Sequence, residues 1–149
     1  MEGPGAAVSV RVLIARLADD SIGIEECREA VASADAGAVV TFEGVVRDHD
    51  DGRSVTALSY TAHPTAEAAI RASAERIAAA HPNVRLAVVH RTGDLVVGDV
   101  ALTCAVASAH RAAAFAACAD LVDDVKGTVP IWKEQRFGDG STEWVASLG

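Results

Sequence analysis

The sequence predicts one α+β domain, spanning residues 1–149, with a mainly antiparallel sheet and about three helices. A chain of 149 residues is large enough to bury a single core. Short strand-like segments are separated by turns rich in glycine and aspartate, which favours antiparallel neighbours. Helical segments are inserted between them, so the expected order is β-α-β-β-α-β-β-α-β-β.

The N-terminal third predicts a strand, a helix and a hairpin after a loose tail at residues 1–6. Valine and isoleucine alternate with other residues over 8–14, as in a strand with one apolar face. A short helix is expected at 24–34. Two apolar segments flank an Asp- and Gly-rich turn at 48–52, so 38–61 is expected to be a hairpin.

The middle of the chain predicts a helix followed by two strands. Residues 66–80 are rich in alanine and follow Pro64, a residue that suits the start of a helix. Strands are expected at 84–90 and 100–107, with a short segment between Gly93 and Gly98.

The C-terminal third predicts a third helix and a closing hairpin. Ser108 is expected to be the N-cap of a helix that ends near Val125, with Gly127 at the C′ position. The apolar stripe of this helix comprises Ala114, Phe115, Cys118, Leu121, Val122 and Val125. Strands at 129–137 and 143–145 follow, joined around Gly138 to Gly140.

The composition argues against several classes of function. No apolar run approaches the roughly 20 residues of a membrane span, and the N-terminus does not resemble a signal peptide. A net charge of −8 argues against nucleic-acid binding and implies that any anion site is a local basic pocket. Cys27, Cys104 and Cys118 form no metal-binding motif, which is typical of reduced thiols in a cytoplasmic protein.

The two lysines of the chain are the first candidates for chemistry. Eleven of the 13 basic residues are arginine, whereas Lys126 and Lys133 lie seven positions apart. Arginine stays protonated, but a desolvated lysine can lose its proton and act as a base or nucleophile. The alternatives are a lysine that stabilises a helix end and an exposed strand lysine.

Three further basic residues predict an anion site. His110 and Arg111 fall in the first turn of the third helix, where positive side chains are unfavourable unless an anion binds. Arg47 ends a strand that contains Gly44 and suits a phosphate or carboxylate. The alternatives are solvent-exposed or ion-paired side chains.

Several segments recur, in this order, in a known family. They are Phe42–Arg47, Leu58–Tyr60, His90–Gly93, Gly98, Ser108–Arg111 with Ala114-Phe115, Val122–Lys126 and Pro130–Lys133. The chain resembles the large, catalytic subunit of molybdopterin synthase over about residues 8–145. The resemblance implies an α/β hammerhead fold. The sequence departs from the family at His63, Thr65 and Gln135, where tyrosine, methionine and glutamate are frequent.

The resemblance implies a sulfurtransferase of molybdenum cofactor biosynthesis. Such subunits take sulfur from a ubiquitin-like small subunit, whose C-terminal Gly-Gly carries a thiocarboxylate. They place two sulfurs on cyclic pyranopterin monophosphate, which forms the dithiolene of molybdopterin without a metal or organic cofactor. Two large subunits form a central homodimer with one small subunit at each end, a heterotetramer.

The resemblance also implies the site residues. Lys126 and Lys133 would be catalytic. The substrate-binding residues would be Arg47, His110 and Arg111, and the pocket for the partner's tail would include Phe42, Pro130 and Trp132. One alternative is a non-catalytic scaffold that binds the ubiquitin-like tail or the pterin. Another is an unrelated enzyme that forms a Schiff base through Lys126.

Overall fold

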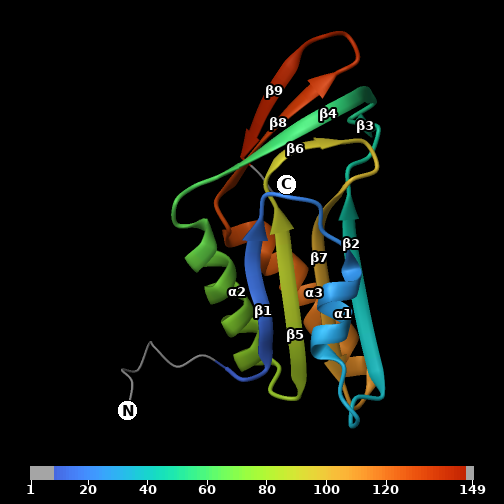
Figure 1. Cartoon of the computed structure of the whole chain (residues 1–149), viewed down its shortest axis with the longest axis vertical. Coiled ribbons are helices and arrows are strands. Elements are labelled where there is room, and N and C mark those ends of the chain that lie inside the picture. The colour runs from blue at the N-terminus through green and yellow to red at the C-terminus, as the bar shows by residue number, and fades with distance from the viewer. Residues whose placement is uncertain (1–8, 147–149) are drawn as a thin grey trace.

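The structure, a computed structural model, describes residues 9–146 (Figure 1). Three helices and nine strands follow one another in the described part of the chain. Their bounds are β1 (Val12–Ala18), α1 (Ile24–Val31), β2 (Ala38–Val45), β3 (His49–Asp50), β4 (Arg53–Ala62), α2 (Ala66–Ala80), β5 (Val84–Arg91), β6 (Gly93–Val96), β7 (Val100–Ser108), α3 (Arg111–Thr128), β8 (Ile131–Phe137) and β9 (Thr142–Ala146).

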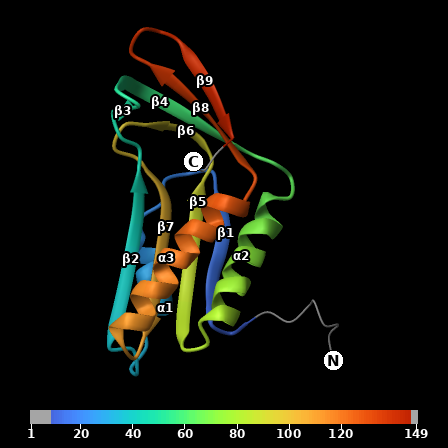
Figure 2. The ribbon, with the colours of Figure 1, turned by 180° about the vertical axis from the view of Figure 1, so that it is seen from behind.

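The larger layer is a sheet in the order β1-β5-β7-β2, with helices on both faces (Figures 1 and 2). β1 and β5 are parallel, and the other neighbours are antiparallel. Alternation along β5 sends Leu86 and Val88 to the core under α2 and α3, and Ala87 and Val89 to the core under α1. The interior strands β5 and β7 are therefore apolar on both faces.

A smaller sheet in the order β3-β4-β8-β9, with β6 also paired to β4, stands at one end of the larger sheet (Figure 1). A small apolar cluster of Val46, Leu58, Leu95 and Ala101 joins the two layers. The predicted α+β class, the three helices and the mainly antiparallel pairing are confirmed.

The predicted hairpin over residues 38–61 is wrong. β2 pairs with β7, whereas β4 pairs with β8, β6 and β3. The side chains of Ala38, Val40 and Phe42 alternate toward the core under α2 and α3, which assigns β2 to the larger sheet. Only the two residues of β3 fold back on β4, through a turn in which Asp51 and Gly52 have φ of 52° and 77°.

The first strand and first helix also differ from their predicted bounds. The strand begins at Val12 rather than Val8, which lies outside the described residues, and Val10 is exposed. A register shift between Val12 and Ile14 breaks the alternation on which the prediction relied. The helix α1 ends at Val31, three residues earlier than expected.

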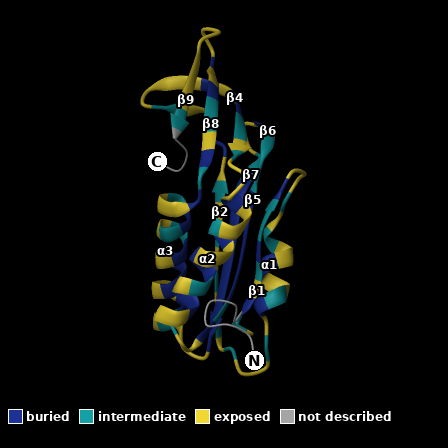
Figure 3. Cartoon of the chain, turned by 90° about the vertical axis from the view of Figure 1, so that its left-hand side faces the viewer, coloured by how far each residue is buried: buried dark blue, intermediate teal, exposed yellow. Residues whose placement is uncertain are grey.

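The third helix begins and ends later than the sequence predicts. Ser108 is the buried last residue of β7, and His110 is the N-cap. The helix runs through Gly127 to Thr128, so Gly127 is not at C′. Phe115 is 61% exposed, because the buried face is centred on Ala114, Ala117, Cys118, Leu121 and Val125 instead. Figure 3 shows exposed turns on the outer side of α3 and the buried strands between α3 and α1.

No helix within residues 9–146 is both long and apolar enough to cross a membrane.

Candidate active site

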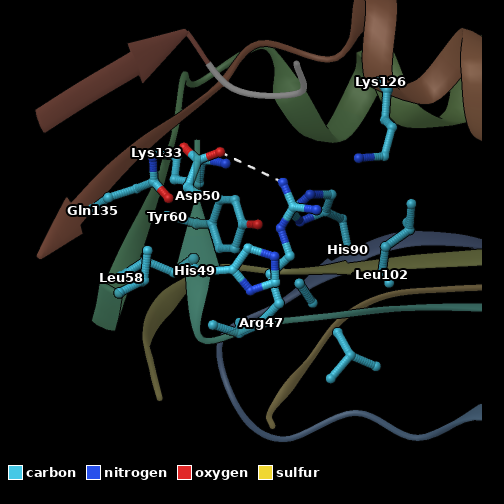
Figure 4. A pocket seen from close by; sticks show the side chains of 15 residues that line it. Arg47, His49, Asp50, Leu58, Tyr60, His90, Leu102, Lys126, Lys133 and Gln135 are labelled. Carbon is cyan, nitrogen blue, oxygen red and sulfur yellow. Dashed lines mark hydrogen bonds and ion pairs between the residues drawn. The ribbon is translucent and has the colours of Figure 1, made fainter. Parts of the chain in front are cut away.

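A cavity of about 370 Å³ opens where the two sheets meet (Figure 4). We call it the lysine cavity. Its apolar wall comes from β2, β4 and β7. Its polar lining consists of Arg47, His49, Asp50, Tyr60, His90, Lys126, Lys133 and Gln135.

Both lysines reach this cavity from adjacent elements. Lys126 lies in the last turn of α3, and the chain turns directly into β8, which carries Lys133. Alternation along β8 places Lys133 and Gln135 on the face toward the cavity, whereas Trp132 lies on the opposite face. The predicted pairing of the two amines in one site is therefore present in the structure.

Burial lowers the pKa of Lys133 below its ordinary value. The positive charges of Lys126 and Arg47 lower this pKa further, and the carboxylates of Asp50 and Glu143 act in the opposite direction. A lysine in this setting exchanges its proton more readily near neutral pH than a lysine on the surface does.

Arg47 lies just beyond β2, where its side chain forms part of the cavity lining. Its Nη2 atom is 3.5 Å from Oδ1 of Asp50. The other carboxylate oxygen, Oδ2 of Asp50, accepts a 2.7 Å hydrogen bond from Nε2 of Gln135. The hydrogen bond from Gln135 is the main reason that the pKa of Asp50 lies below its usual value, and the charges of Lys133 and Arg47 add to it.

His90 and Tyr60 form the inner wall of the cavity. His90 is 3% exposed, and its Nδ1 lies 2.7 Å from the carbonyl oxygen of Arg91. Because a carbonyl only accepts, Nδ1 carries the proton of the neutral ring. Burial is the main cause that lowers the pKa of His90 to about 4, and burial raises the pKa of Tyr60. At neutral pH the ring of His90 is uncharged beside two lysines.

Sequence reasoning did not single out Asp50, Tyr60, His90 or Gln135 as parts of a common site. Leu58–Tyr60 and His90–Gly93 were among the recurring segments, so the signal for Tyr60 and His90 was present. Asp50 belonged only to an acidic turn in the sequence. The structure places Asp50 on β3, where its carboxylate accepts a hydrogen bond from Gln135.

His110 and Arg111 lie at the opposite end of α3 from Lys126. Sixteen residues separate His110 from Lys126, and a helix rises 1.5 Å per residue, so they are about 24 Å apart along the axis. His110 and Arg111 line a separate depression together with Gly37, Ala38, Ala109 and Ala112. Within one chain, therefore, the structure does not bring this pair to the lysine cavity.

The residues expected to line the pocket for the partner's tail also lie outside the lysine cavity. Phe42 packs from β2 against the core under α2 and α3. Trp132 is 46% exposed on the outer face of β8. Pro130 lies between α3 and β8, and its carbonyl accepts a 3.0 Å hydrogen bond from the backbone N–H of His63.

Within residues 9–146, no group of three or more His, Cys, Asp or Glu side chains has an arrangement that could hold a metal ion. The three cysteines are buried and are not joined by disulfides.

The comparisons with known proteins agree with this fold. A family model described as MoaE protein matches residues 17–128. Molybdopterin synthase catalytic subunit 1 of Mycobacterium tuberculosis is 39% identical over 133 residues, which cover 87% of this chain and 88% of that protein. The X-ray structure of molybdopterin synthase from Staphylococcus aureus matches with a TM-score of 0.82 at 32% identity, over 88% of this chain and 96% of the other.

A chain in the complex of subunits 1 and 2 of molybdopterin-converting factor from Helicobacter pylori matches with a TM-score of 0.68. It covers 92% of this chain and 90% of the other at 19% identity, which shows a shared fold. The resemblance noted in the sequence is thus confirmed by the family model and by relatives more than 30% identical. The chain belongs to the MoaE protein family, whose matched curated members are molybdopterin synthase catalytic subunits.

Proposed function

We propose that this protein transfers sulfur from a thiocarboxylated ubiquitin-like small subunit to cyclic pyranopterin monophosphate, forming the dithiolene of molybdopterin. The observation that carries the proposal is the convergence of Lys126 and Lys133 in one cavity beside Arg47. These are the only two lysines of the chain. Within a protein of net charge −8, a local cluster of positive charge suits an anionic pterin phosphate.

The proposed reaction needs charge stabilisation and proton transfer. In each transfer the thiocarboxylate sulfur attacks a carbon of the pterin side chain, and water then releases the small subunit with a C-terminal carboxylate. Opening of the cyclic phosphate develops negative charge on oxygen, which Arg47 and the lysines stabilise. A lysine whose pKa is lowered by burial can also move a proton in this step.

His110 and Arg111 enter the proposal through a second copy of the chain. They lie about 24 Å from Lys126 along α3, so one chain cannot place both groups on one small pterin. A homodimer could bring the N-terminus of α3 from one copy toward the lysine cavity of the other. The two groups would then bind the same anion, the phosphate through the helix N-terminus.

The small subunit is proposed to bind at each end of this homodimer, giving a heterotetramer in the cytoplasm. The Helicobacter pylori protein of the same fold is a complex of two subunits, which agrees with such an assembly. Phe42, Pro130 and Trp132 remain proposed contacts of the small subunit's tail, and Trp132 offers an exposed aromatic surface for it.

A non-catalytic scaffold is the second candidate, and Gln135 is the observation in its favour. This residue presents an amide inside the lysine cavity where a carboxylate is frequent in the family. A scaffold would bind the small subunit and the pterin without turnover.

The test is a single-turnover mixture of this protein, a thiocarboxylated small subunit and the cyclic pterin, followed by mass spectrometry. The expected result is a pterin that gains two sulfurs while the small subunit returns to a carboxylate. A stable complex with no sulfur on the pterin would replace the enzyme with the scaffold. Borohydride reduction of a parallel sample should trap no adduct on Lys126, because the proposed reaction has no Schiff base.

A further inference from the structure

The lysine cavity contains one carboxylate among several basic groups. Of the described residues that line it, only Asp50 is acidic, whereas Arg47, Lys126 and Lys133 are cationic. The rest of the protein carries its acidic excess outside this cavity. Among the described residues, Asp50 is therefore the one carboxylate of the cavity lining that offsets the positive charge of Arg47 and the two lysines.

Both oxygens of this carboxylate have partners from different elements. Oδ2 accepts the hydrogen bond from Gln135 on β8, and Oδ1 faces Arg47 beyond β2. Gln135 is itself 3% exposed, so its amide is a buried donor. Figure 4 shows Asp50, Gln135 and Lys133 gathered on one side of the cavity. The short strand β3 is thus fixed by a contact that spans 85 positions of the chain.

The amide and the carboxylate are complementary at this contact. A carboxylate accepts hydrogen bonds and an amide nitrogen donates them, so Gln135 holds Asp50 in its ionised form. A glutamate at 135 beside Asp50 would put two negative groups in contact, and one of them would take up a proton. The contact between positions 50 and 135 therefore accommodates one negative charge, which Asp50 carries in this protein.

Lys133 lies two residues before Gln135 on the same face of β8, and its amine is partly removed from water. The charged and titratable groups around it come from every neighbouring element. They are Arg47 beyond β2, His49 and Asp50 on β3, Tyr60 on β4, His90 on β5, Lys126 on α3 and Glu143 on β9. Asp50 is the stronger of the two acidic influences on Lys133, and the cationic neighbours oppose it.

We propose that Asp50 is a positioning residue that keeps Lys133 protonated and holds Arg47 at the cavity, with Gln135 as its fixed hydrogen-bond donor. Lys133 is then the lysine that enters the reaction as a cation and can donate a proton. The electrostatic part of this proposal concerns this chain alone, whereas its catalytic consequence rests on the proposed sulfur transfer.

Asp50→Asn isolates the charge from the hydrogen bond, because the asparagine oxygen can still accept from Gln135. The double variant Asp50→Asn with Gln135→Glu exchanges the two groups and restores one carboxylate. Asp51→Asn is the matched control. It removes the same charge from the same turn, is exposed, does not line the cavity, and asparagine tolerates its positive φ.

The first readout is the pH-dependent rate of trace acetylation of each lysine, measured by peptide mass spectrometry. Only Lys126 and Lys133 carry side-chain amines, so the two signals are separable. We expect Asp50→Asn to move the titration of Lys133 down by about one pH unit, the usual effect of losing a nearby opposite charge. The double variant should return it toward the wild-type value, and Asp51→Asn should leave it in place.

An unchanged titration of Lys133 in Asp50→Asn would overturn the proposal, as would a double variant that behaves like the single one. This readout needs neither the small subunit nor the pterin, so it remains decisive even if the wild-type protein transfers no sulfur. In the sulfur-transfer assay, the basic limb of the pH profile should move to lower pH in Asp50→Asn and move back in the double variant. If Asp50→Asn changed the maximal rate of sulfur transfer but not its pH dependence, the proposal that protonated Lys133 takes part in the reaction would be contradicted.

Discussion

The ring of His90 stands edge-on to the ring of Tyr60, with the ring centroids 5.0 Å apart and the planes at 86°. This contact and the hydrogen bond to the carbonyl of Arg91 fix the position of the ring, and burial lowers the pKa of His90 so that the imidazole is neutral. The strands β4 and β5, which carry the two residues, belong to different sheets. The pair therefore joins the two layers at the cavity, and its stability should depend on the protonation of His90.

We predict that His90 makes the protein less stable as the pH falls from about 6.5 to about 4. The pKa of His90 is about 4 in the fold and near 6.5 in the unfolded chain, so in this window the unfolded state binds a proton that the folded state does not. The full difference of about 2.5 pH units corresponds to about 3 kcal/mol. Urea unfolding at pH 7 and pH 4.5 measures most of this effect.

His90→Asn is the control for this titration, because its amide can still donate to the carbonyl of Arg91 but takes up no proton. The variant will be less stable at both pH values, yet the drop between pH 7 and pH 4.5 should be smaller than in the wild type. An equal drop in both proteins would assign the acid sensitivity to the carboxylates instead.

Much of the secondary structure could be predicted because its signals are local. The alanine-rich segment 66–80 is α2 with the predicted bounds, and the two lysines are close in the sequence and in space. The pairing of strands depends on residues that are far apart in the sequence, which is why the hairpin of β2 and β4 was predicted wrongly. Asp50 was missed for the same reason, since its significance depends on Gln135, 85 positions away.

Details of α3 were predicted less well, because alanine weakens the signals that fix a helix face. Ala114 and Ala117 are fully buried, but Ala112, Ala116 and Ala119 are exposed, so the alanines did not mark the buried face and the hydrophobic pattern did not exclude Phe115 from it. Ser108 is a good N-cap residue by type, but its pairing within the sheet keeps it in β7. Tertiary pairing outweighed the local capping preference here.

Two glycine substitutions should have opposite effects on the free energy of unfolding. Gly127→Ala should stabilise the protein by about 0.5–1 kcal/mol, because Gly127 lies inside α3 with open space around it. Gly37→Ala should destabilise it by about 1–3 kcal/mol, because the new methyl carbon would lie 2.8 Å from the carbonyl oxygen of Ala109. Denaturant unfolding of both variants measures the difference. Destabilisation by Gly127→Ala would instead support a helix that ends at that residue.

Substitution of His110 or Arg111 should weaken pterin binding more than small-subunit binding. Arg111→Ala removes one charged contact to the phosphate, and we expect this to weaken the binding free energy of the pterin by about 1.5–3 kcal/mol. Trp132, a proposed contact of the small subunit, lies on the smaller sheet and is not altered by this substitution. Calorimetric titration with each ligand separates the two effects. Equal losses for pterin and small subunit would contradict an anion site at the start of α3.

Single-turnover sulfur transfer by Lys126→Ala, compared with the wild type and with Lys126→Arg, tests whether the reaction takes place in the lysine cavity. We predict that Lys126→Ala still binds the small subunit and the pterin but transfers sulfur at least about 100-fold more slowly, the usual cost of losing a proton-transfer group. Lys126→Arg, which keeps the charge but cannot exchange the proton, should also be slow. Two sulfurs added by Lys126→Ala at the wild-type rate would contradict a reaction centred on the lysine cavity.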